Sequence, residues 1–264
     1  MHQQLAEIYR QTRGRAGAGE PIVMTAGDDI VDPAHLLTCL RAGAVRYPYF
    51  RLRAGGGAGG EIAARQTRVV TGGMQVAGFA DVETIERELD AGAFLQFSRL
   101  AHWHRHVREV VTGLGHELGS AVDSRLFLAR RDGATMALRT EHPTFLIQVR
   151  GQALLDGVPR RRGTAVLDSG RALLLSTPAG LRAEVRDESC LLLLAVREPM
   201  PADYAKVLKT CALTADARLT SHFHLMSQEE RSAAAKQALM DVAARMSADK
   251  LSTMTATMMR QEAG

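Results

Sequence analysis

The chain has 264 residues, of which 46% are hydrophobic and 23% are charged, and its 33 basic and 29 acidic side chains give a formal net charge of +4. This length and apolar content predict one large core, or one domain with a smaller appendage, and exclude disorder along the whole chain. The slightly basic balance is typical of a surface rich in arginine and does not by itself indicate a nucleic-acid partner.

The cysteines, Cys39, Cys190 and Cys211, are odd in number and far apart. This spacing is typical of reduced thiols and not of a disulfide framework. The first twenty residues contain no apolar run like that of a signal peptide, and the longest apolar stretch, Cys190–Val196, is too short to span a bilayer. We therefore expect a cytoplasmic protein without a membrane partner.

The N-terminal third predicts an arm, a helix and a loop. Residues 1–20 combine a short helical pattern with the tract RGRAGAGE, for which we expect a flexible arm. Asp32–Ala42 begins with Asp-Pro and carries leucines at helical spacing, so it predicts a helix with Asp32 as N-cap. Residues 55–60, GGGAGG, predict a loop.

The middle of the chain passes from helical to extended patterns. Asp81–Ala91 predicts a helix that ends at Gly92, Ala93–Leu100 a strand, and His102–Leu118 a second helix. Strand-like runs separated by Asp-Gly and Asp-Ser-Gly turns follow at Arg125–Arg130, Thr144–Arg150, Gly163–Leu167, Ala172–Ser176 and Glu184–Val196. Short strands punctuated by turns indicate a barrel or a sandwich.

After Pro199 the pattern is helical. Ser227, followed three residues later by Glu230, predicts a capping box, and an apolar stripe follows at Leu239, Val242, Ala243 and Met246. We therefore divide the chain into the arm 1–20, a β domain 21–198 and a helical region 199–264. The helical region is expected either to mediate dimerisation or to pack on its own barrel.

The stretch GATMALRTEHPTFLIQVRG, Gly133–Gly151, resembles the core of the JmjC-type cupin oxygenases, in particular the branch that includes bacterial ribosomal-protein hydroxylases. That pattern reads roughly HxDxHDxFxLQVxG, and its frame is kept here at Glu141, His142, Phe145, Leu146, Gln148, Val149 and Gly151. The segments Pro48–Gly56, Asp81–Gly119 and Val122–Gly133 follow the family order, so Gly43–Val196 can be aligned. The resemblance implies a mainly β fold with flanking helices, namely a double-stranded β-helix (cupin/JmjC-like) barrel plus a C-terminal helical element.

The resemblance also implies a 2-oxoglutarate-dependent Fe(II) dioxygenase, in which a His, an Asp two residues later and a distal His hold the iron. The corresponding positions here are Leu138, Thr140, and Leu181 or Arg182. Leucine cannot bind iron, and a neutral threonine hydroxyl is a poor substitute for a carboxylate. We therefore expect neither Fe(II) nor 2-oxoglutarate as cofactor unless this ligand alignment is wrong, and whether the chain is an enzyme stays open.

Several residues near these positions are candidates for lining the old cavity: Arg139, Glu141, His142, Gln148 and Arg182. Arg139 either adds positive charge to the cavity or points to solvent by strand alternation, and we favour solvent. The histidines His102, His104 and His106 lie at the start of a predicted helix without a metal-binding motif around them, so we expect a structural role for them.

The leading hypothesis is a pseudo-oxygenase that binds a peptide, a protein or a small metabolite, as a homodimer or as a heterodimer with an active family member. The alternative is an active non-haem oxygenase, or another cupin enzyme, with a displaced or metal-independent site. A weaker hypothesis uses the basic arm and the turn Pro159–Gly163 for nucleic acid, which we do not expect. Whether the former metal cavity is open or filled stays open.

Overall fold

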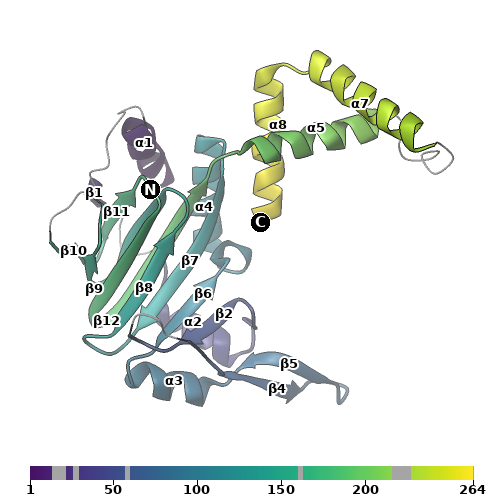
Figure 1. Ribbon diagram of the computed structural model, residues 1–264. Coiled ribbons are helices and arrows are strands. Elements are labelled where there is room, and N and C mark those ends of the chain that lie inside the picture. The colour runs from purple at the N-terminus through teal and green to yellow at the C-terminus, as the bar shows by residue number, and fades with distance from the viewer. Residues whose placement is uncertain (14–21, 26–29, 57–59, 160–162, 216–226, 264) are drawn as a thin grey trace. The chain divides into compact units, whose positions relative to one another are not determined.

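The computed structural model describes residues 1–13, 22–25, 30–56, 60–159, 163–215 and 227–263 (Figure 1). The chain divides into two units, one formed by Met1–Glu117 and Val122–Arg197 and the other by Leu118–Ala121 and Glu198–Gly264. Among the described residues, no helix combines the length and the apolar character needed to cross a bilayer.

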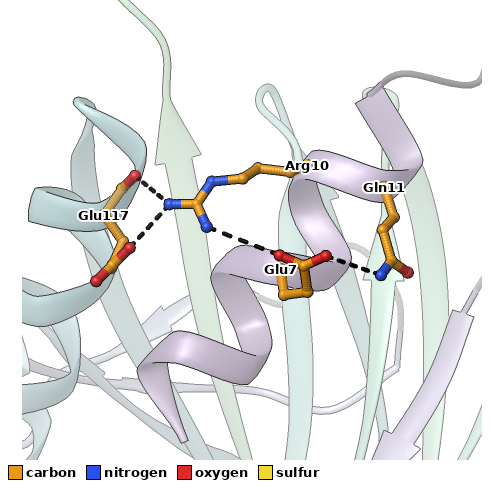
Figure 2. A network of polar contacts seen from close by, with 4 residues as sticks. All are labelled: Glu7, Arg10, Gln11 and Glu117. Atoms are coloured by element: carbon orange, nitrogen blue, oxygen red, sulfur yellow. Dashed lines mark hydrogen bonds and ion pairs between the residues drawn. The ribbon is translucent and has the colours of Figure 1, made fainter.

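The short helical pattern at the N-terminus is confirmed as helix α1 (His2–Arg13). The helix is ordered because Leu5, Ala6 and Tyr9 are buried along one face. Figure 2 shows its polar contact with helix α4 (Arg105–Leu118), in which Arg10 Nη2 donates to the backbone oxygen of Glu117 at 2.7 Å and to its Oε2 at 2.8 Å. This hydrogen bond lowers the pKa of the Glu117 carboxyl. Residues 14–20 of the expected arm lie outside the described residues.

The helices that have side-chain caps were predicted correctly. Helix α2 (Pro33–Arg41) has Asp32 as N-cap, whose Oδ1 accepts from the Ala34 amide at 3.0 Å. Helix α3 (Val82–Asp90) is capped by Asp81. The predicted helix at His102 is interrupted, because a 3₁₀ turn (Leu100–His102) follows Arg99 in the left-handed region at φ 51°. Helix α4 therefore begins only at Arg105.

The strands form one large antiparallel sheet whose hydrogen-bonded order is β1-β11-β9-β12-β7-β6-β2-β3, with β10 also paired to β9 and β8 to β12. Their bounds are β1 (Ile22–Thr25), β2 (Phe50–Arg53), β3 (Glu61–Ile62), β6 (Phe94–Ser98), β7 (Ala121–Ala129), β8 (Thr135–Thr140), β9 (Thr144–Asp156), β10 (Ala165–Asp168), β11 (Arg171–Leu175) and β12 (Ala179–Arg197). The five predicted runs correspond to β7, β9, β10, β11 and β12, and both β9 and β12 are longer than predicted.

The long strands β9 and β12 pair with each other along most of their lengths, and each half of either strand has a different second neighbour. The first half of β9 pairs with β11 and its second half with β10. The first half of β12 pairs with β8 and with the second half of β9, whereas its end pairs with the start of β9. Gly151 lies between the halves of β9 at φ 73°, and a Cβ there would come within 2.4 Å of the Glu188 carbonyl oxygen. This close approach requires glycine where the two halves of β9 meet.

An apolar core is formed on this sheet, and we call it the interior cluster. It takes side chains from both halves of the long strands. Its buried members are Phe94, Phe127, Ala129, Ala134, Met136, Leu138, Leu146, Ala153, Leu155, Val158, Ala165, Leu167, Leu173, Leu175, Leu181, Ala183, Val185, Leu191 and Leu193.

A separate two-stranded sheet consists of β4 (Arg65–Val69) and β5 (Gln75–Ala80), drawn in Figure 1 as a hairpin beside α3 and β2. The sequence did not predict it, because its strands are mostly polar and exposed and lack a clear apolar alternation. Its turn contains Gly72 and Gly73, both at positive φ.

The second unit contains helices α5 (Pro201–Ala215), α7 (Gln228–Arg245) and α8 (Ala248–Ala263). The predicted capping box is confirmed, since Ser227 and Glu230 each accept a hydrogen bond from the other's backbone amide. The predicted stripe lies only in part on the packed face of α7. Its Val242 packs with Ala234, Ala238 and Ala212 of α5, whereas its Leu239 is 39% exposed.

Candidate functional site

The positions that the sequence aligned with the family's iron ligands lie close together in the first unit. Leu138 of β8 and Leu181 of β12 are directly opposite each other in the antiparallel register. Alternate residues of β8 are buried, which places Leu138 and Thr140 on the same interior face. Leu138 is 2% exposed, Thr140 6% and Leu181 4%. Arg182, the other candidate for the distal position, is exposed on the opposite face of β12.

The chemistry around these positions is apolar. Leu138 and Leu181 both belong to the interior cluster, which contains no ionisable side chain. The Thr140 hydroxyl donates to the Ala179 carbonyl oxygen at 3.3 Å and accepts from the Ala179 amide at 3.0 Å. Its hydrogen-bonding capacity is therefore used by the neighbouring strand. The side chains of Leu138, Thr140 and Leu181 therefore supply none of the imidazole or carboxylate ligands that iron needs.

The other candidate residues do not line one pocket. Arg139, Glu141 and Arg182 are exposed, and His142 is half-buried. The exposure of Arg139 agrees with the strand alternation that favoured solvent for it. Only Gln148 is fully buried, at 0% exposure. The structure thus separates Gln148 from the charged residues that the sequence grouped with it.

Gln148 and Ser189 form a small polar pair in this unit, and the sequence did not indicate Ser189. Gln148 Nε2 donates to Ser189 Oγ and to the Arg150 carbonyl oxygen, both at 2.6 Å. Its Oε1 is buried without a hydrogen-bond partner among the described residues, which costs about 1–3 kcal/mol. The pair lies where β12 shifts register between Arg186 and Cys190. The polar sequence at 187–189, which interrupts the apolar strand, was the available signal.

A shallow surface cavity of about 370 Å³ lies where the ends of β2, α3 and β7 meet the start of β8. Gly55 is required in its wall, because a Cβ there would come within 2.4 Å of the Gly92 carbonyl oxygen. The amides of Gly56 and Gly133 already donate to backbone carbonyls, so they do not form an anion site. The lining residues are Ala54, Gly55, Gly56, Ile62, Glu88, Ala91, Gly92, Ala93, Arg131, Asp132, Gly133, Ala134 and Thr135.

The sequence predicted a structural role for His102, His104 and His106, and His104 has such a role. Its Nδ1 accepts from the Val107 amide at 3.4 Å and caps α4. Its ring centroid lies 6.1 Å from that of His35 and 6.3 Å from that of His106. Burial lowers the pKa of His104, and the charges of His35 and His106 lower it further. Across the described ranges, no group of three or more His, Cys, Asp or Glu side chains could hold a metal ion.

No family model matches the sequence, and no curated protein matches it. Solved structures of YcfD, a ribosomal oxygenase from Escherichia coli, do match the fold. The structure of that protein with cobalt and succinic acid matches 90% of this chain and 67% of its own length, with a TM-score of 0.56 and 11% identity. Its structure with cobalt and 2-oxoglutarate matches 78% of this chain and 56% of its own length, with a TM-score of 0.53 and 14% identity.

A further structure of the same oxygenase has a TM-score of 0.52 and 13% identity, again with 78% of this chain and 56% of the oxygenase aligned. This chain therefore spans little more than half of the oxygenase in two of the three alignments. At these identities the similarity is one of fold. The chain shares with this JmjC-type oxygenase a mainly antiparallel β sheet with flanking helices.

Proposed function

We propose that this chain is a pseudo-oxygenase: a JmjC/cupin-like protein that binds a macromolecular partner and carries out no iron-dependent hydroxylation. One observation carries the proposal. Leu138 and Leu181, which occupy the aligned positions of the first and distal iron-binding histidines, face each other within the interior cluster. A site that must hold a charged ion and a charged co-substrate cannot be an apolar core, because burying unpaired charge there is prohibitively unfavourable.

We also propose that the fold is a double-stranded β-helix. Two features support it: the change of neighbouring strand between the two halves of β9 and of β12, and the similarity in fold to the ribosomal oxygenase. In such a barrel, β8 and the first half of β12 would be the strands that carry the former ligands. The divergence from the iron triad would then be a conversion of the metal site into core.

The burial of Leu138 and Leu181 in the interior cluster favours a partner at the surface over a small metabolite inside a barrel. We therefore narrow the expected ligand to a peptide or a protein. The second unit suits self-association, since α7 exposes Leu239 and Met240, the latter at 58%. We propose this helical region, residues 199–264, as the dimerisation element, and the region 21–198 as the JmjC/cupin-like domain. The three free cysteines fit a reducing, cytoplasmic compartment.

The test is metal content and metal response, with the Escherichia coli ribosomal oxygenase as positive control. Both purified proteins are analysed for iron by mass spectrometry, then heated with Fe(II), Mn(II) or Co(II), with and without 2-oxoglutarate. We expect thermal stabilisation of the control and no shift for this chain. Stoichiometric iron in this chain, or a 2-oxoglutarate-dependent shift, would refute the proposal and support the alternative of a displaced site.

A second measurement separates binding from catalysis. Conversion of 2-oxoglutarate to succinate is followed with both proteins under air. Succinate formation by this chain that disappears in a His142→Ala or Glu141→Ala variant would establish an active enzyme. Formation at the rate of the protein-free reaction is the expected result.

A further inference from the structure

The segments 46–53 and 65–80 contain five arginines and no lysine, aspartate or glutamate. They are apart in sequence but adjacent in space, because the Tyr47 amide donates to the Gly78 carbonyl oxygen at 2.8 Å. The first segment leads into β2, and the second is the hairpin of β4 and β5. These two adjacent segments therefore carry a local excess of positive charge, although the composition of the whole chain is nearly balanced.

Four of these arginines are arranged in pairs around two aromatic rings, and we call them the arginine patch. The Cζ atoms of Arg46 and Arg68 lie 4.4 and 5.0 Å from the centroid of the Phe79 ring. Those of Arg65 and Arg51 lie 4.3 and 5.7 Å from the centroid of the Tyr47 ring. Each contact of this kind contributes about 0.5–1 kcal/mol at an exposed site, so the rings hold the guanidinium groups in place.

The Phe79 ring is itself fixed. It is 5% exposed, and a Cβ at Gly43 would come within 2.6 Å of its Cε1 atom. Arg68 above it donates from Nη2 to the Ala80 carbonyl oxygen at 3.3 Å. This support leaves less side-chain entropy to lose when a ligand binds.

The positive charge of the patch is poorly neutralised. Arg51 Nη1 lies 3.7 Å from Glu61 Oε2. Arg46, Arg65 and Arg68 form no ion pair with any described residue. The two Cζ atoms that share a ring can be no farther apart than the sum of their distances to the ring centroid. For both rings this upper limit is no longer than about 10 Å, which is the Debye length at 0.1 M salt, so salt screens the two charges only partly. They therefore repel each other in the free protein, and a bound anion would relieve that repulsion.

We propose that the arginine patch binds single-stranded nucleic acid through its phosphate backbone. Phosphodiesters fit better than the carboxylates of an acidic protein for two reasons. The patch is made of arginine without lysine, and the planar guanidinium group, which binds phosphate and carboxylate alike through two nitrogens, also stacks on bases. Exposed Gln66, Thr67 and Gln75 on the same hairpin add neutral hydrogen-bonding groups suited to sugars and bases.

The proposal is tested by fluorescence anisotropy with labelled single-stranded RNA of about 20 nucleotides, which exceeds the usual footprint of one binding site. DNA of the same sequence and a poly-glutamate peptide serve as the other ligands. The test variant is Arg65→Gln/Arg68→Gln. The matched control is Arg139→Gln/Arg182→Gln, which removes the same charge from exposed positions on β8 and β12. Arg65→Lys/Arg68→Lys keeps the charge but not the planar group.

We expect the chain to bind RNA and DNA with an affinity that falls as salt rises. The glutamine variant should bind at least about tenfold more weakly, and the slope of log K against log salt should decrease by about 1.4, for two lost phosphate contacts. The affinity of the lysine variant should lie between those of the wild-type chain and the glutamine variant. The control variant should retain the wild-type slope of log K against log salt. No binding of RNA or DNA, preference for poly-glutamate, or equal weakening by the control would each overturn the proposal. Circular dichroism of each variant checks that it is folded.

Discussion

The free energy of unfolding of a Leu181→Ala variant distinguishes a packed interior from an open one. Leu181 is 4% exposed, faces Leu138 across β12 and β8, and belongs to the interior cluster. The substitution removes three carbon atoms, which at about 0.8 kcal/mol each is a loss of about 2.4 kcal/mol in transfer free energy. The remaining cavity adds to this, so the free energy of unfolding should fall by about 3–5 kcal/mol. A leucine that lined a solvated pocket would lose about 1 kcal/mol or less.

The assay is urea unfolding followed by the fluorescence of Trp103, the single tryptophan. Its ring lies 5.7 Å from that of Phe97 in β6, so the signal reports on the unit that contains the interior cluster. The matched control is Leu154→Ala, at a half-buried position of β9 that alternates with the buried Ala153 and Leu155. We expect the control to cost about 1 kcal/mol, with m unchanged in both variants.

The result that refutes the reasoning is a Leu181→Ala variant no less stable than the control. The interior would then be open, and an internal ligand would again be a candidate. A double-mutant cycle with Leu138→Ala gives an independent check. Because the two leucines are cross-strand partners, we expect a coupling free energy of at least about 0.5 kcal/mol.

Two further predictions concern the helices. The pKa of His104 is lowered in the folded state, so the unfolded chain binds more protons, and the free energy of unfolding should fall as the pH falls below about 6.5. The variant His104→Asn keeps an acceptor for the Val107 amide and should flatten this pH dependence. The measurement is the urea midpoint from about pH 8 to pH 5. An unchanged pH dependence in the variant would assign the effect to another group. In sedimentation equilibrium we expect a dimer that Met240→Glu converts to a monomer, because a charge would replace an exposed apolar side chain of α7. Ser232→Glu, at another exposed position of the same helix, is the control, and a monomeric wild-type chain would remove the proposed dimerisation element.

The parts of the fold that were predicted correctly depend on local chemistry. Asp32 and Ser227 cap helices through hydrogen bonds to amides two or three residues away, and such signals are present in the sequence itself. The end of β9 was missed because Gly151 interrupts its apolar run, although the strand continues to Asp156. The hairpin of β4 and β5 was missed because neither of its faces is covered enough to require apolar alternation.

The candidate site, like the fold, was predicted from the sequence only where local signals were sufficient. Strand alternation was sufficient to expect Arg139 in solvent, on the face opposite to Leu138 and Thr140. That Leu181, and not Arg182, faces them depends on the register of β12, which is fixed by contacts distant in sequence. The arginine patch was not foreseen for a related reason. Its two rings and four arginines come from two segments, which are joined by contacts between them such as the Tyr47–Gly78 hydrogen bond and the stacking of Arg46 on Phe79.

The pairing of β9 with β12 along most of both strands has a consequence for recognition. Strands β8, β10 and β11 each pair with one of these two strands, so local opening of this part of the sheet should be rare compared with complete unfolding. A partner that docks on this part of the sheet would therefore meet a surface that is already ordered. Little conformational entropy would be lost in that step, and the affinity would depend mainly on the side chains that the sheet presents.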